Sequence, residues 1–271
     1  MTSTARRLSL TVLALLAFAA ARSAPAAADP SKQKPTIVLV HGAFADASSW
    51  SAVVQRLQQK GYTVLAPPNP LRGVDSDAAA IASVLKTVDG PIVLVGHSYG
   101  GIVISQAAQG NANVKALVYV AAFALDTGES AGAILQKYPA PKFTPDHLRA
   151  VPYALPCGAG NGTDMYIKAD AFHDIFASDL PAATAAAMAA TQRPLEGSAI
   201  GTNFAGTPAW KSIPSWALVS RADNAIAPAA ERFMAQRAHA HIVEVDASHA
   251  VAVSHPDAVV DLIVDAAHSV H

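Results

Sequence analysis

At residues 96–101 the chain reads Gly-His-Ser-Tyr-Gly-Gly, between an apolar run at 91–95 and a helix-like run at 102–109. A Gly-x-Ser-x-Gly stretch between a strand and a helix is typical of a sharp turn that presents a reactive serine. The two glycines that flank Ser98 lack the Cβ that would prevent the backbones from passing. The backbone N–H of Tyr99 then lies at a helix N-terminus, where it favours developing negative charge. We therefore predict that Ser98 is a catalytic nucleophile.

The first 28 residues have the pattern of an export signal. Arg6 and Arg7 precede an uncharged apolar stretch at 8–21, and Ala26-Ala27-Ala28 offers an A-x-A cleavage site. The stretch is 14 residues long, whereas a membrane-spanning helix needs roughly 20. We therefore expect a signal peptide at 1–28, cleaved after Ala28, and a secreted or periplasmic protein without a stable membrane anchor. The arginine pair leaves Sec and twin-arginine export both open.

The composition indicates one large α/β domain with a substantial core. The chain has 271 residues, of which 52% are hydrophobic and 14% charged. Without residues 1–28 it keeps 16 basic and 20 acidic residues, a balance that gives no electrostatic basis for binding nucleic acid. Cys157 is the only cysteine, so no intramolecular disulfide is possible. The oligomeric state stays open.

Buried-strand runs alternate with helix-like runs along most of the chain. Expected strands lie at 36–40, 63–66, 91–95, 114–120, 215–220 and 240–245. Expected helices lie at 50–60, 78–88, 102–109, 228–237 and 257–268. This alternation predicts an α/β fold with a mostly parallel central sheet flanked by helices.

The alternation breaks after the strand at 114–120. Short helical pieces are expected there at 134–137, 145–149, 168–176 and 181–191. This stretch has more aromatic and large aliphatic residues than its short helices can bury among themselves. We predict a helical cap at 123–213 that lies over Ser98 and lines an apolar pocket, between core segments at 29–122 and 214–271. A helical insertion packed away from the site is the alternative.

Two residues after later strands complete a catalytic set with Ser98. Asp223 follows the strand at 215–220, and His249 follows the strand at 240–245. An imidazole takes the serine proton during attack, and a carboxylate fixes the imidazole tautomer. The order nucleophile, acid, base, with each residue after its own strand, predicts Ser98, Asp223 and His249 as a triad.

One alternative exists for the acid and one for the base. Asp126 follows the strand at 114–120 and is the other candidate acid. His255 is the other candidate base, but it directly precedes Pro256, which biases it to an extended backbone at a helix entrance. We therefore assign the base to His249.

The first strand also ends in candidate site residues. It runs into His41-Gly42-Ala43-Phe44, at the carboxyl end of a central strand, where open α/β sheets place their sites. The small Ala43 can bring a second backbone N–H close to a substrate carbonyl. We predict Ala43 and Tyr99 as oxyanion-hole donors, and Phe44 and His97 as substrate-binding residues.

At these residues the chain resembles the small α/β-hydrolases that begin directly at the His-Gly strand. This group includes plant methylesterases, hydroxynitrile lyases and bacterial serine esterases. The resemblance spans about residues 35–267, is weakest in the cap, and rests on Val-His-Gly-Ala-Phe at 40–44, the stretch at 96–101, and the matching places of Asp223 and His249. It implies cofactor-free hydrolysis of a small-molecule carboxylic ester or lactone through an acyl-enzyme, with oxyanion-hole amides from Ala43 and Tyr99.

Other functions fit the residues less well. Hydroxynitrile lyases of this type have a lysine directly after the catalytic histidine, where this chain has Ala250, and a hydroxyl residue near the His-Gly loop, where it has Ala43. Perhydrolase-type chemistry uses the same triad and stays open. A non-catalytic binder of small apolar ligands would not need the complete triad. His239 and His241 have no carboxylate or cysteine cluster beside them, so we expect no metal site.

Overall fold

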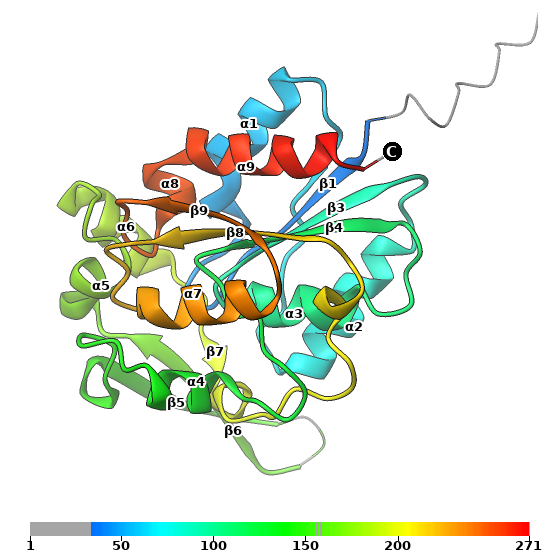
Figure 1. Cartoon of the computed structure of the whole chain (residues 1–271). Coiled ribbons are helices and arrows are strands. Elements are labelled where there is room, and N and C mark those ends of the chain that lie inside the picture. Colours follow the sequence, from blue (N-terminus) through cyan, green and yellow to red (C-terminus); the bar gives the residue numbers. More distant parts are fainter. Residues whose placement is uncertain (1–33, 156, 158, 271) are drawn as a thin grey trace, which may run out of the picture.

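The computed structural model describes residues 34–155, 157 and 159–270, so the expected signal peptide lies outside the described residues. In this part of the chain, six strands form a central sheet in the order β2-β1-β3-β4-β8-β9, and each neighbouring pair is parallel (Figure 1). The strands are β1 Thr36–Val40, β2 Val64–Leu65, β3 Ile92–His97, β4 Val114–Val120, β8 Ser215–Ser220 and β9 His241–Val245. The predicted parallel α/β sheet is confirmed.

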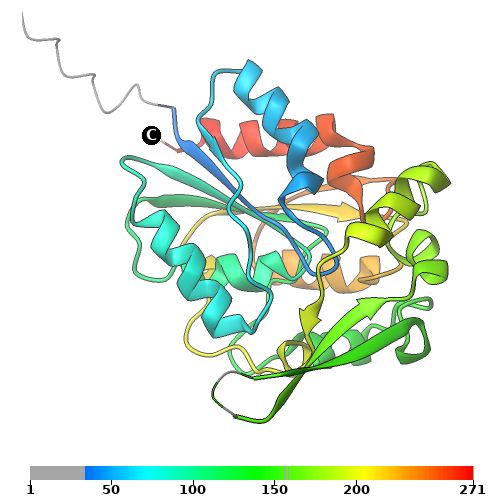
Figure 2. The same ribbon diagram turned by 180° about the vertical axis from the view of Figure 1, so that it is seen from behind.

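Helices cover both faces of this sheet (Figures 1 and 2). One face carries α1 Ser51–Gln59, α8 Val251–Ser254 and α9 Pro256–His268. The other carries α2 Val74–Leu85, α3 Gly100–Ala107 and α7 Pro228–Arg237. No helix in the described ranges is long and apolar enough to cross a membrane.

Each face of the sheet has its own hydrophobic core. Successive side chains of a strand point to opposite faces, so Ile37 and Val93 pack under α1 and α9 while Val38 and Leu94 pack with α2 and α3. All four side chains are fully buried. This two-sided burial explains why the central strands are continuous apolar runs rather than alternating ones.

The chain between β4 and β8 forms an insertion that is helical only in part. Its helices are α4 Ala131–Lys137, α5 Ala169–Phe176 and α6 Ala182–Thr191. Beside them lies a three-stranded antiparallel sheet of β5 Leu148–Ala154, β6 Asn161–Ile167 and β7 Leu195–Glu196. The expected helix over 145–149 is wrong, because a short 3₁₀ turn at Pro145–His147 leads directly into β5. The expected helical cap is therefore corrected to a mixed α/β insertion.

The physical reason for this correction is that β5 is stabilised by pairing and not by its own sequence pattern. Its backbone pairs with β6 from Leu148 opposite Ile167 to Ala154 opposite Asn161. The strand contains Pro152, which a sheet tolerates here because β5 lies at the sheet edge. Its side chains are exposed or half-buried, so the segment lacks the apolar alternation that would have indicated a strand.

Candidate active site

Ser98 stands in the tight turn between β3 and α3. Its backbone φ is +55°, a left-handed value that non-glycine residues rarely adopt. A Cβ at Gly96 would come 2.6 Å from the carbonyl oxygen of Gly100, and a Cβ at Gly100 would come 2.5 Å from that of Val40. Side-chain carbons do not approach backbone atoms so closely, so both positions require glycine. The turn places the Ser98 hydroxyl at the carboxyl edge of the sheet.

His249 and Asp223 reach the same edge from the loops after β9 and β8. His249 Nδ1 lies 2.5 Å from Asp223 Oδ2, and both side chains are almost completely buried. Asp223 Oδ1 accepts hydrogen bonds from the backbone N–H groups of Ala225 and Ile226, at 2.7 and 2.8 Å. The carboxylate is therefore held at both oxygens. It fixes Nδ1 as the protonated ring nitrogen and leaves Nε2 as a proton acceptor.

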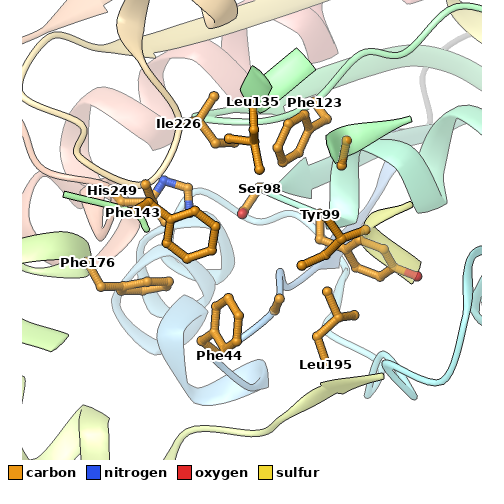
Figure 3. A pocket seen from close by; sticks show the side chains of 14 residues that line it. Phe44, Ser98, Tyr99, Phe123, Leu135, Phe143, Phe176, Leu195, Ile226 and His249 are labelled. Carbon is orange, nitrogen blue, oxygen red and sulfur yellow. The ribbon is translucent and has the colours of Figure 1, made fainter. Parts of the chain in front are cut away.

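Ser98 and His249 line one pocket. Figure 3 shows the Ser98 hydroxyl directed into this pocket, on the side where the His249 ring lies. Among the described residues the structure records the Asp223–His249 hydrogen bond but none between Ser98 and His249. Serine–imidazole hydrogen bonds are often long without substrate and shorten when substrate binds.

Two backbone amides beside Ser98 are available to a substrate oxygen. In the described part of the chain the N–H groups of Ala43 and Tyr99 donate to no protein acceptor, whereas the next amide, that of Phe44, donates to Arg193 O at 3.1 Å. A Cβ at Gly42 would lie 2.6 Å from the Cβ of Ser98, which shows how closely this loop approaches Ser98. The geometry brings together the two amides that the sequence analysis selected.

A buried histidine, His41, holds the loop that carries Ala43. His41 Nδ1 lies 2.9 Å from Gly42 O, and His41 Nε2 accepts the backbone N–H of Asn69 at 3.0 Å. The Asn69 side-chain amide donates to His41 O, also at 3.0 Å. Burial lowers the pKa of His41, which agrees with a neutral ring that donates at one nitrogen and accepts at the other. His41 and Asn69 therefore shape the loop, a function that the sequence analysis did not identify.

The Tyr99 side chain anchors the second amide. Its hydroxyl donates to Asp77 Oδ2 at 2.8 Å, and Asp77 is a buried residue of α2 that also accepts the backbone N–H of Arg72. Burial raises the pKa of Asp77, and burial together with Asp77 raises the pKa of Tyr99. The phenol therefore stays neutral and donates. This bond connects Tyr99, the residue after Ser98, to α2.

The prediction that His97 binds substrate is corrected by its position. His97 is not among the residues that line the pocket. Its ring is buried between Trp50, Phe176 and His249, and its Nε2 lies 2.9 Å from the carbonyl oxygen of His249. Burial lowers the pKa of His97 well below its usual value, so the ring is neutral and its Nε2–H donates to that carbonyl. His97 therefore packs against His249 and lies outside the pocket wall.

The pocket above Ser98 is small, almost entirely apolar and partly open to solvent. Phe44, predicted as a substrate-binding residue, lies in its wall and packs against Phe143 of the insertion (Figure 3). The other apolar lining residues are Ala43, Phe123, Ala131, Leu135, Phe176, Leu195, Ile200, Ala225 and Ile226. Leu135, Phe143, Phe176 and Leu195 come from the insertion, which therefore forms part of the pocket wall rather than packing away from it.

The alternative acid and the alternative base lie outside this pocket. Asp126 forms an ion pair with Lys211 at 2.6 Å. The His255 ring is about two-fifths exposed, and its Nδ1 lies 2.9 Å from Ser254 Oγ and 3.6 Å from Asp179 Oδ2. Neither side chain is directed toward Ser98 by these contacts.

The insertion also holds the loop that carries His249. Asp179, between α5 and α6, accepts the backbone N–H of Ser248 at 3.0 Å and the Ser248 hydroxyl at 2.5 Å. The backbone N–H of Ala250 donates to Phe176 O at 2.8 Å. The residues on both sides of His249 are thus hydrogen-bonded to the insertion. Asp179 and Ser248 were not identified from the sequence, because nothing local to either residue indicates that they meet.

Asp223→Asn is expected to lower kcat roughly 10⁴-fold with little change in KM, because an amide favours the wrong imidazole tautomer. The matched control is Asp126→Asn, which removes the charge that pairs with Lys211 and should leave kcat close to that of the unmodified protein. Steady-state kinetics on one chromogenic ester checks both variants. A larger loss in Asp126→Asn would transfer the role of the acid to Asp126.

A parallel sheet that carries serine, histidine and aspartate at its carboxyl edge, beside two unpaired amides, defines a class of proteins with an α/β-hydrolase fold. The chain belongs to the alpha/beta hydrolase family, which it matches over residues 37–262. It is 29% identical over 257 residues to the alpha/beta hydrolase nvfD of Aspergillus novofumigatus, a match that covers 86% of this chain and 97% of that protein. The resemblance to plant methylesterases and a hydroxynitrile lyase also reflects distant homology.

One further relative and one solved structure carry hydrolase or esterase names. A pyrethroid hydrolase of Sphingobium wenxiniae is 29% identical over 169 residues, a match that covers 54% of this chain and 55% of that protein. The crystal structure of polyneuridine aldehyde esterase superposes with a TM-score of 0.73 at 18% identity, covering 86% of this chain and 99% of that chain. At that identity the structural likeness concerns the fold alone.

Proposed function

We propose that the protein is an exported serine hydrolase that cleaves a carboxylic ester or lactone of a small apolar substrate. The observation that carries this proposal is the placement of the Ser98 hydroxyl, the Asp223–His249 pair and the two unpaired amides around one apolar pocket. Each group matches one requirement of acyl transfer: a nucleophile, a general base with a fixed tautomer, and donors for an oxyanion.

In the proposed reaction, Ser98 Oγ attacks the substrate carbonyl carbon while its proton passes to His249 Nε2. The carbonyl oxygen becomes an oxyanion that accepts hydrogen bonds from the Ala43 and Tyr99 amides. Asp223 stabilises the imidazolium that forms. When the intermediate collapses, His249 returns the proton to the leaving alcohol and Ser98 remains acylated. A water molecule activated by His249 then hydrolyses the acyl-enzyme by the same steps.

The pocket wall favours ester hydrolysis over hydroxynitrile lyase activity and over ligand binding without catalysis. Among the described lining residues there is no lysine or arginine, so the pocket offers no cationic side chain to a cyanide leaving group. The apolar wall instead suits an acyl group or alcohol with hydrocarbon character. A binder without catalysis would have no use for Asp223 buried against His249, because removing the Asp223 carboxylate from water costs free energy that ligand binding does not recover.

A panel of p-nitrophenyl esters of increasing acyl length, with methyl esters, lactones and a cyanohydrin, tests this function. We expect turnover of short and medium esters, a decline when the acyl chain outgrows the pocket, and no cyanide release. Ser98→Ala supplies the background rate for every substrate. Cyanide release without ester turnover would support a lyase, and absence of turnover together with tight ligand binding would support a binder.

The export part of the proposal rests on the pattern of residues 1–28. In a host with an export system, N-terminal sequencing should find Asp29 or a close neighbour as the first residue. Recovery of the soluble protein with Met1 or Thr2 at its N-terminus would remove this part and leave the proposed chemistry unaffected.

A further inference from the structure

A second carboxyl group is buried behind the catalytic acid. Glu231 lies on α7 and is only 3% exposed. Its Oε2 accepts the backbone N–H of Ser220, at the end of β8, at 3.0 Å. Its Oε1 is buried and meets no hydrogen-bond donor in the described part of the chain. An ionised carboxylate in this position would leave a buried acceptor oxygen unsatisfied, which is strongly unfavourable.

Glu231 and Asp223 both bond to Ser220: the Asp223 backbone N–H donates to Ser220 O at 3.2 Å, and the Ser220 backbone N–H donates to Glu231 Oε2. The two buried carboxyl groups are therefore close neighbours, and the charge of Asp223 acts on Glu231. Two buried carboxyl groups this close do not both ionise, because their charges repel in a poorly solvated site. Burial, and then the charge of Asp223, raise the pKa of Glu231 well above its usual value of 4.5. One proton is therefore expected in this pair at neutral pH.

The hydrogen bonds decide which carboxyl group holds that proton. Asp223 accepts two backbone N–H groups at Oδ1 and the His249 ring at Oδ2, and all three favour its ionised form. Glu231 accepts only one backbone N–H. The other charged group that acts on it, Arg232, pairs with Glu244 at 2.7 Å on the protein surface. The proton therefore belongs on Glu231 Oε1, the oxygen without a donor.

We propose that Glu231 is a positioning residue, whose neutral carboxylic acid donates a hydrogen bond from Oε1 to the Asp223 carboxylate and accepts one from Ser220. This inference rests on the proposed function only in so far as Asp223 is the catalytic acid. Glu231 links that acid to the end of β8 and fixes its orientation toward His249. A neutral donor does this without adding a positive charge that would oppose the imidazolium formed during catalysis.

The protonation state can be tested without measuring activity. The unfolded chain releases the Glu231 proton above about pH 4.5, while the folded protein retains it up to the raised pKa. The folded state then binds one more proton than the unfolded state, so its stability falls as the pH rises through this window. Glu231→Gln keeps the shape of the side chain but does not titrate. The comparison therefore isolates the proton of Glu231, because every other titratable side chain is present in both proteins.

Urea unfolding of the unmodified protein and of Glu231→Gln, compared between about pH 5.5 and 7.5, gives the result. The ratio of their unfolding equilibrium constants, unmodified over variant, should rise about tenfold per pH unit. A ratio independent of pH would show that Glu231 is ionised in the folded protein and would overturn the proposal. This readout is valid even if the protein hydrolyses no ester, so failure of the proposed function and failure of this inference are distinguishable.

Kinetics of two variants test the positioning itself. Glu231→Gln keeps an N–H donor toward Asp223 and should retain kcat within about threefold, whereas Glu231→Leu removes the donor and should lower kcat by roughly 10- to 100-fold with KM almost unchanged. Normal kcat in Glu231→Leu would overturn the positioning role. If Glu231→Gln folds but loses as much kcat as Glu231→Leu, the proposal that Glu231 acts as a neutral hydrogen-bond donor is overturned. If Glu231→Leu does not fold, the Glu231→Gln rate and its unfolding ratio decide alone.

Discussion

Replacing Ser98 with alanine is expected to abolish ester turnover, with a loss of roughly 10⁶-fold in kcat. Alanine lacks the hydroxyl that attacks the carbonyl carbon, but it keeps the Cβ that packs against the loop at Gly42. The fold should therefore be unchanged, and the thermal unfolding midpoint should match that of the unmodified protein. Steady-state hydrolysis of a p-nitrophenyl ester and a melting curve measure the two effects separately.

Ser105→Ala provides a matched control from the same helix. The Ser105 hydroxyl is buried, donates to Gly101 O at 2.7 Å and lies 2.7 Å from the Tyr119 hydroxyl, outside the pocket. Its loss should destabilise the protein by about 1–3 kcal/mol and leave kcat nearly unchanged. The two serines should thus show opposite effects. Retention of most activity in Ser98→Ala would contradict the mechanism as a whole.

His249→Ala is expected to reduce kcat by several orders of magnitude, because no other described group in the pocket can accept the Ser98 proton. His255→Ala is its matched control in the same part of the chain. The His255 ring is partly exposed and contacts Ser254 and Asp179, so its removal should leave most of the activity. Both variants are compared on one ester under identical conditions. An inactive His255→Ala together with an active His249→Ala would transfer the role of the base.

The central sheet, and the meeting of Asp223 with His249 near Ser98, were predictable because their signals are local. The turn at Ser98 needs glycine on both sides, and the strands that precede Ser98 and Asp223 are buried on both faces and so have continuous apolar sequences. The strand that precedes His249 is the edge strand β9, whose side chains are exposed or half-buried. In a parallel sheet the residues after successive strands meet at one edge. The order of Ser98, Asp223 and His249 along the chain was therefore enough to predict that they lie at the same edge of the sheet.

The insertion was predicted less well because its structure depends on contacts between distant residues. β5 becomes a strand by pairing with β6, and the walls of the pocket include Phe143, Phe176 and Leu195 from three different segments. No local pattern indicates which of these side chains face Ser98. A composition rich in apolar residues predicted a lined pocket but not the residues that line it.

Two histidines and one glutamate also have roles that the local sequence does not indicate. His97 lies next to Ser98 in the sequence, yet its ring is directed beneath His249 and away from the pocket. His41 supports the loop of Ala43 rather than the substrate. In the sequence, Glu231 is an ordinary polar residue of α7. Only its burial beside Asp223 in the structure indicates a function. In each case the packing of separate elements decides the role.

Covalent trapping tests directly whether Ser98 is the nucleophile. Diethyl 4-nitrophenyl phosphate phosphorylates a serine hydroxyl that a neighbouring base activates, and it releases p-nitrophenolate as it does so. We expect one adduct per chain by intact mass, located at Ser98 by peptide fragmentation, and a loss of ester turnover in proportion to the fraction modified. Ser98→Ala should form no adduct. An adduct at another residue, or full ester turnover in a protein that is completely modified at Ser98, would contradict the account.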